Sequence, residues 1–183
     1  MRRTWRRYRP ASPTSWSWNG SRLAAIAHRL KRLWDERAVV LPGSLLAVYD
    51  LGRGLCREFV FSPDAAAGEL TRAKPVLTTL ARDTLLVIDR LYCTAAFFAA
   101  PGTQGCWGLV RWNRRLGKRH HEGGRLEDWL VQAGSGATAP VQALRYIRWR
   151  RGRSRYELLS NVLDPAWLSA VEALALYPGR WTI

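Results

Sequence analysis

The chain has 183 residues, of which 48% are hydrophobic and 23% are charged, a composition typical of a globular domain with its own core. Lys and Arg number 29 against 14 Asp and Glu, so the net charge is +15 and a polyanion is the expected partner, nucleic acid before a membrane surface. The three cysteines form no C-x-x-C pair, and no apolar run approaches the roughly 20 residues that cross a bilayer, which excludes a disulfide framework, a cysteine zinc site and a membrane span.

The free cysteines favour a reducing, cytoplasmic setting. Residues 1–13 are rich in Arg and contain two prolines, so we expect a disordered basic arm before a core that spans residues 14–183. Residues 14–18 alternate Ser with Trp as a short strand does, and Asn19-Gly20 is typical of a turn. Residues 22–37 have one apolar and one basic face at helical spacing, which predicts an amphipathic helix.

A β-hairpin is predicted next. Residues 44–49 form an apolar strand that ends at Asp50, glycines at 52 and 54 make the turn, and residues 55–61 return with alternating polarity. Residues 63–81 then predict a helix, in which Pro75 is an unfavourable interior residue.

The stretch Thr84–Thr94, TLLVIDRLYCT, organises the middle of the chain. Leu85–Ile88 is a short apolar run typical of a buried central strand, and it stops at Asp89. An acid at the carboxyl end of a buried strand lies at the rim of a sheet, where ligands and metals bind. The alternative is that Asp89 only caps the helix that follows. That helix is predicted at residues 95–100, ended by Pro101-Gly102, before another strand at residues 106–112.

Residues 113–162 predict an inserted basic β segment. Residues 113–136 change in character, beginning with the polar, basic and Gly-rich run NRRLGKRHHEGGR, and the composition of residues 134–140 predicts a loop. Strands predicted at 141–149 and 155–162 are joined by a basic turn. Asp164 is the expected N-cap of a helix at residues 165–177. The alternative to phosphate binding by this segment is a solvated basic face. The phosphate-binding candidates are Arg111, Arg114, Arg115, Lys118, Arg119 and the run from Arg148 to Arg155, which includes Arg150, Arg151 and Arg153.

These elements predict an α/β fold in which a mixed sheet is flanked by helices. The segments NGSRLAAIAHRLKRL, LPGSLLAVYD, LLVIDRLYCTAAFF, WGLVRWN and RYELLSNVLDPAWLSAVEALALYPGRW resemble the DDE transposases of bacterial insertion sequences, from about Trp18 to Ile183. The most specific pieces are D-x-x-Y at Asp89 and Y-x-x-R-W, which supplies Tyr177, Arg180 and Trp181.

The resemblance implies a ribonuclease H-like sheet, DNA as substrate, and strand cleavage and transfer with Mg²⁺ or Mn²⁺. In ribonuclease H-like nucleases, acids on the first strand, at the end of a middle strand and on the final helix hold two divalent metals, which prefer oxygen ligands. Asp89 would be the second of these metal-binding acids, and Tyr177, Arg180 and Trp181 would contact DNA.

The chain departs from the family pattern at two positions. Asn19 stands where the family has its first acid, and a neutral amide is a much weaker Mg²⁺ ligand than a carboxylate. The pattern continues Y-x-x-R-x-x-x-E, which puts the third acid directly after Ile183, where the sequence stops. Asp50 is a candidate substitute for the first acid, and a surface turn is the alternative role for it. We therefore expect a core that is incomplete at its C-terminus.

Three functional hypotheses follow. The first is a DNA-binding DDE transposase that does not cleave or transfer strands on its own. The second is a non-catalytic DNA-binding protein that competes with a full-length transposase for its transposon ends, with self-association or pairing with that relative. The third is an unrelated basic α/β module, such as an RNA-associated protein.

Overall fold

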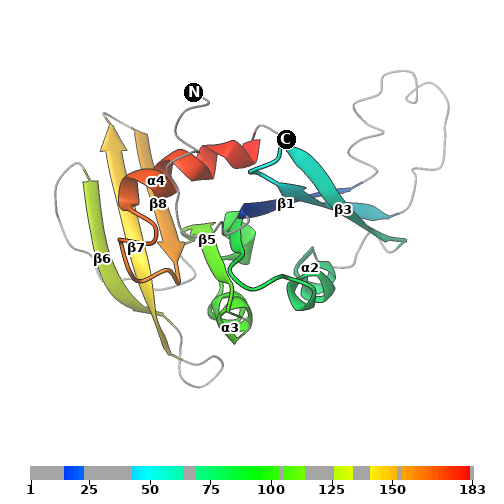
Figure 1. The fold of residues 1–183 in the computed structure, drawn as a ribbon, viewed down its shortest axis with the longest axis horizontal. Helices are drawn as coiled ribbons and strands as arrows, with labels where there is room; N and C mark the ends of the chain where they lie inside the picture. Colours follow the sequence, from blue (N-terminus) through cyan, green and yellow to red (C-terminus); the bar gives the residue numbers. More distant parts are fainter. Residues whose placement is uncertain are drawn as a thin grey trace.

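A computed structural model of the chain describes residues 15–22, 43–63, 69–103, 105–113, 126–133, 141–151 and 154–181. These residues form an α/β fold around an eight-stranded mixed sheet with the strand order β3-β2-β1-β4-β5-β8-β7-β6. Helices α2 and α3 lie on one side of the sheet, and α4 lies on the other (Figure 1). The prediction of a mixed α/β sheet flanked by helices is confirmed. The predicted arm at 1–13 and most of the predicted helix at 22–37 lie outside the described residues.

Three antiparallel strands form one half of the sheet, and the predicted hairpin is confirmed. The prediction of a turn at Asn19-Gly20 is wrong, because both residues continue the first strand. Their backbones pair with Ala47 and Leu46 of the second strand, and these pairs satisfy the groups that a turn would expose. The strands are β1 (Ser15–Arg22), β2 (Ser44–Asp50) and β3 (Leu55–Ser62).

The centre of the sheet is parallel. Strand β4 (Leu85–Ile88) pairs in parallel with both β1 and β5 (Trp107–Arg111), and each residue of β4 is buried. A strand that is covered on both faces reads as a continuous apolar run, which explains why β4 was predictable. A 3-10 turn, η3 (Arg90–Tyr92), follows directly after Asp89.

Two of the predicted helices have different bounds. Helix α2 (Glu69–Thr78) is shorter than expected and holds Pro75 in its interior. Helix α3 (Ala95–Thr103) continues through Pro101 and Gly102, so the prediction that this pair ends the helix is wrong. Phe97 and Phe98 of α3 are buried in the core beside β4 and β5. This packing outweighs the local preference of a proline near the end of the helix.

The other half of the sheet is antiparallel and comes from the inserted segment. Strands β7 (Gln142–Arg151) and β8 (Ser154–Ser160) form the predicted basic hairpin, and β8 joins the insertion to β5. Strand β6 (Leu126–Ala133) pairs with β7 at the edge, where the sequence predicted no strand. Glu127, a charged residue, is one of the residues that β6 buries, which obscured the pattern of the strand. The predicted loop at residues 134–140 lies outside the described residues.

The last helix begins later than predicted. Asp164 closes a turn by accepting a hydrogen bond from the backbone of Ala166, and α4 (Ala170–Leu176) starts only after Ser169. Ser169 and Glu172 form a reciprocal capping box, which satisfies backbone donors at the start of the helix. From Tyr177 the chain tightens into a 3-10 turn, η4 (Tyr177–Trp181), which includes Pro178 and Gly179.

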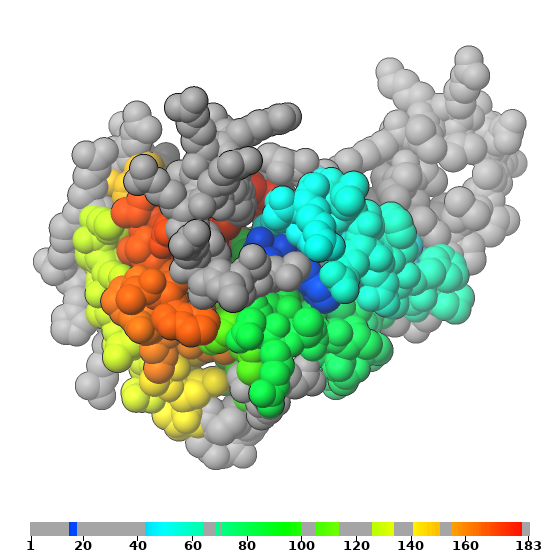
Figure 2. All heavy atoms as spheres, viewed as in Figure 1, coloured from blue at the N-terminus to red at the C-terminus, as the bar shows by residue number. Residues whose placement is uncertain are grey.

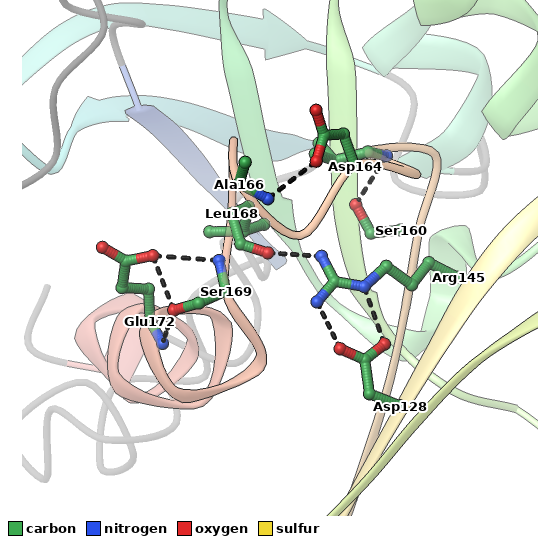
Figure 3. A network of polar contacts seen from close by, with 9 residues as sticks. Asp128, Arg145, Ser160, Asp164, Ala166, Leu168, Ser169 and Glu172 are labelled. Carbon is green, nitrogen blue, oxygen red and sulfur yellow. Dashed lines mark hydrogen bonds and ion pairs between the residues drawn. The ribbon is translucent and has the colours of Figure 1, made fainter.

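A buried arginine ties the insertion to α4. Arg145 of β7 donates from Nε to Asp128 Oδ1 at 2.7 Å and pairs with the second oxygen of the same carboxylate. It also donates to the carbonyl oxygen of Leu168, directly before the cap of α4 (Figure 3). In the space-filling view the orange residues that lead into α4 lie against the yellow-green strand β6 (Figure 2). We call Arg145, Asp128 and Leu168 the insertion clamp.

Candidate functional site

Asp89 lies at the carboxyl end of the buried central strand, as predicted. Its backbone takes the N-cap position of η3, but its side chain makes no capping hydrogen bond. The carboxylate instead accepts a hydrogen bond from Arg180 Nη2 at 2.7 Å on Oδ2, across 91 residues of sequence. The Asp89 side chain therefore binds Arg180 and does not cap the turn that follows it.

Tyr177 and Arg180 reach Asp89 because η4 packs on β4. A 3-10 turn has three residues per turn, so residues i and i+3 lie on the same side. Both side chains are buried, with Tyr177 3% and Arg180 5% exposed. Residues from the two most specific pieces of the sequence resemblance, Asp89 and the Tyr177–Arg180 pair, thus meet in one place.

Neighbouring strands place two further residues level with Asp89. Ser15 pairs with Leu85 and Trp16 with Leu86, and this parallel register, carried three residues further, sets Asn19 level with Asp89. On the other side Val110 pairs with Ile88, so Arg111 is next to Asp89 in register. Arg111 is exposed. The rim therefore has the sequence positions Asn19, Asp89 and Arg111 in one row.

Burial and the charged groups at this rim change the pKa of the Tyr177 hydroxyl. Burial raises the pKa of the Tyr177 hydroxyl to about 12. The positive charge of Arg180 lowers this pKa, and that of Arg111 does the same to a smaller extent. The negative charge of Asp89 raises the pKa further. Tyr177 is consequently neutral over the whole physiological range, and it lies among charges of both signs.

Asp50 belongs to the opposite rim. It pairs with Trp16, which is level with Leu86, so it lies three residues toward the amino end of β4 from Asp89. Its Oδ1 accepts hydrogen bonds from the backbones of Gly52 and Arg53, both at 3.0 Å. Asp50 therefore organises the β2–β3 turn, which is the alternative that the sequence left open for it.

The described basic candidates divide into exposed and buried side chains. Arg111 and Arg150 are exposed, whereas Arg148 is buried in an ion pair with Glu127 and is not available to phosphate. The prediction of Arg148 as a phosphate ligand is therefore wrong. Residues 151 and 181 are described by their backbone alone, as the end of β7 and the end of η4. Candidates that lie outside the described residues are Arg114, Arg115, Lys118, Arg119 and Arg153.

Among the described residues, the group that contacts Asp89 is a guanidinium and not a further metal ligand. Mg²⁺ and Mn²⁺ prefer several oxygen ligands, most often with more than one carboxylate. In the part of the chain that the structure describes, no group of three His, Cys, Asp or Glu side chains is placed to hold a metal ion. Asp89 is the described carboxylate at this rim, and the cation that it binds is Arg180.

The sequence reasoning missed the insertion clamp and the buried Arg148–Glu127 pair. Arg145 is 2% exposed and Arg148 4%, and both were hidden in a basic run that reads as a surface. A signal was present in the adjacent acids Glu127 and Asp128, which stand out in a basic segment, and the structure places Glu127 directly opposite Arg148.

Comparison with known proteins gives no family assignment: neither the models of known protein families nor the curated protein sequences contain a match to this chain. Within the described residues, no helix has the length and apolar character needed to span a membrane.

Proposed function

We propose that this chain is a DNA-binding protein built on the ribonuclease H-like core of an insertion-sequence DDE transposase, and that it does not cut DNA by itself. The observation that carries the proposal is the meeting of Asp89 with Tyr177 and Arg180 at one rim of the sheet. These residues come from the two most specific pieces of the resemblance, and nothing local in the chain requires them to be neighbours.

The arrangement of strands supports the same proposal. In ribonuclease H-like nucleases the first acid is on the first strand, and the second acid ends a middle strand. Here β1 and β4 are parallel neighbours, and their register, continued by three residues, would set Asn19 level with Asp89. On that register the two positions that the resemblance assigns to acids are neighbours, with an amide at one of them.

Charge supports DNA as the ligand. The net charge is +15, and the exposed Arg111 is next to Asp89 at the proposed site. Arg150, also exposed, extends basic character onto the β7–β8 hairpin. Arginine binds phosphate well because its planar guanidinium can donate two parallel hydrogen bonds. A DNA ligand in a bacterium also implies a cytoplasmic location.

The first experiment measures DNA binding by fluorescence anisotropy at several salt concentrations. Each phosphate contact releases counterions, so the affinity is expected to fall by orders of magnitude between about 50 and 200 mM salt. Duplex RNA of the same sequence is the matched comparison. Binding that is absent or insensitive to salt contradicts the DNA-binding proposal, and a clear preference for RNA favours the unrelated basic module.

The second experiment asks whether the chain cuts DNA. Supercoiled plasmid is incubated with the protein and Mg²⁺ or Mn²⁺, and nicked circles are quantified. We expect no nicking above the rate of the Asp89→Ala variant, because the described residues offer one carboxylate where a two-metal site needs several. Metal-dependent nicking that disappears in Asp89→Ala would show instead that the chain is an active nuclease.

The ion pair also favours a second candidate function, a competitor of an intact transposase. A protein that keeps the DNA-binding residues while its acid is neutralised by Arg180 would occupy transposon ends without cutting them. The test mixes this chain with an active transposase of the same family and measures strand cleavage. Cleavage that falls in proportion to the added chain supports competition, and unchanged cleavage contradicts it.

A further inference from the structure

The two side chains of the Asp89–Arg180 ion pair are buried to different extents. The side chain of Arg180 is 4% exposed, whereas that of Asp89 is 32% exposed. A buried guanidinium cannot lose its proton, so its charge requires a partner within the protein. The carboxylate, by contrast, is partly open to solvent at the rim. Arg180 therefore depends on Asp89 more strongly than Asp89 depends on Arg180.

The surroundings of Asp89 disfavour a second cation. Arg180 already contacts the carboxylate, and Arg111 is the adjacent residue on β5 in register. A divalent cation at Asp89 would lie beside the guanidinium of Arg180, and a cation that binds both carboxylate oxygens would displace Arg180 from its partner. Displacement would leave a nine-tenths-buried charge without this carboxylate, which is costly.

We propose that the Asp89–Arg180 ion pair is a latch that seats η4 on β4 and keeps divalent cations from Asp89. The carboxylate that the resemblance assigns to metal thus serves in this chain to hold the C-terminal turn. Tyr177, three residues before Arg180, is the first residue of the same turn and is also buried. This inference rests on the proposed function in one respect, which is that Asp89 is taken as the acid of a metal site.

The first test of the latch measures Mn²⁺ binding without DNA, by the loss of the free Mn²⁺ signal in electron paramagnetic resonance. Wild-type protein and Asp89→Asn are expected to take up the same amount of Mn²⁺. In Arg180→Gln the carboxylate is released, so any additional Mn²⁺ uptake should disappear in the Asp89→Asn/Arg180→Gln double variant. Uptake by wild-type protein that Asp89→Asn abolishes would overturn the latch.

The second test measures thermal unfolding of Asp89→Asn, Arg180→Met and the variant that carries both changes. Asp89→Asn removes a charge partner of a buried guanidinium and should lower Tm by roughly 5 °C. In the Asp89→Asn/Arg180→Met double variant neither charge remains, so its Tm should lie above the value expected from adding the two single changes. The matched control is Glu58→Gln, an exposed carboxylate on β3 whose loss should shift Tm by no more than about 1 °C.

Additive single effects, or an Asp89→Asn variant as stable as the wild type, would refute the latch. None of these measurements contains DNA, so a protein that fails to bind DNA can still show the latch. Conversely, a protein that binds DNA in a salt-dependent manner can lack it. The two proposals therefore succeed or fail separately.

Discussion

Arg180 Nη2 lies 2.7 Å from Asp89 Oδ2, although 91 residues separate the two in sequence. The contact joins the end of the central strand β4 to the turn that follows the last helix. It requires β4, α4 and η4 to be placed correctly at the same time, so it reports on the fold as a whole. Chemically, it turns the carboxylate at the rim of the sheet into half of an ion pair.

The insertion clamp gives the first prediction. Asp128→Ala should lower the free energy of unfolding by roughly 3 kcal/mol, because it leaves the buried guanidinium of Arg145 without its carboxylate. Urea denaturation monitored by circular dichroism measures the change. Replacing both residues, as Asp128→Leu with Arg145→Met, should recover much of the loss, since neither charge is then buried.

The control for the clamp is Arg150→Gln, which removes an exposed arginine from the same strand. This variant should unfold within about 0.5 kcal/mol of the wild type. An Asp128→Ala variant that is no less stable than Arg150→Gln would mean that the clamp contributes nothing to folding.

The entry to β2 gives the second prediction. Gly43 has a φ of 117°, and a Cβ atom there would lie 2.5 Å from the carbonyl oxygen of Ser62. Gly43→Ala combines backbone strain with a backbone clash and should destabilise the protein by about 3 kcal/mol. Gly54→Ala is the matched comparison, because its φ is 71° but the nearest atom to its Cβ, the Tyr49 hydroxyl, is 3.8 Å away.

Strain alone should cost Gly54→Ala about 1 kcal/mol, so the difference between the two variants isolates the clash. Chemical denaturation of both proteins under identical conditions measures it. Equal destabilisation of the two would show that the β2–β3 edge moves to relieve the contact with Ser62.

The sequence predicted correctly those elements whose form is decided by a short stretch of the chain. The run Leu85–Ile88 is apolar throughout because β4 is covered on both faces, and the β2–β3 hairpin has its glycines at the turn. Each of these signals has one dominant physical cause, which is burial for the strand and turn chemistry for the hairpin.

Two elements were predicted wrongly because a polar pair was not recognised. Strand β6 alternates like a strand from Glu127 to Ala133, but its first inward position is a charged residue that is buried against Arg148 of β7. The start of α4 is set by the Ser169–Glu172 capping box rather than by Asp164-Pro165, and this S-x-x-E pattern was readable in the sequence. The long-range pair, by contrast, cannot be read from either strand alone.

The candidate site was predicted as separate pieces. The sequence identified Asp89 from its strand and Tyr177 and Arg180 from the resemblance, but it did not predict that Arg180 contacts Asp89. Arg111 was predicted as a phosphate ligand, and its adjacency to Asp89 depends on the β4–β5 register. A register between strands that are far apart in the sequence cannot be read from either strand alone.

The rim of the sheet gives the third prediction, for DNA binding. Arg111→Gln should weaken binding and reduce the slope of log affinity against log salt concentration by about 1, the expected loss of one phosphate contact. Arg53→Gln is the matched control, since Arg53 is also exposed but belongs to the turn at the opposite rim, beside Asp50. Its affinity and slope should equal those of the wild type.

Fluorescence anisotropy with one labelled duplex measures both variants across a salt series. Equal losses in Arg111→Gln and Arg53→Gln would indicate diffuse attraction to a basic surface, and they would contradict a specific role of the Asp89 rim in binding.

Alkaline stability gives the last prediction. Burial raises the pKa of the Tyr177 hydroxyl to about 12, against an ordinary value of 10. It also raises the pKa of the Cys93 thiol to about 11, against an ordinary value of 9. In the folded protein both groups hold their protons to higher pH than in the unfolded chain, so stability is full below pH 9 and falls as the pH rises toward 12. A two-unit shift corresponds to roughly 3 kcal/mol for each group.

The free energy of unfolding should therefore decline between pH 9 and pH 12, and urea denaturation at successive pH values measures the decline. Tyr177→Phe removes one of the two groups, so its curve should be flatter than that of the wild type above pH 10, while the fall near pH 9 from Cys93 remains. If Tyr177→Phe and the wild type decline in parallel, the Tyr177 hydroxyl is not held neutral by its burial at the start of η4. The packing of η4 on β4, which brings Arg180 to Asp89, would then be looser than the structure shows.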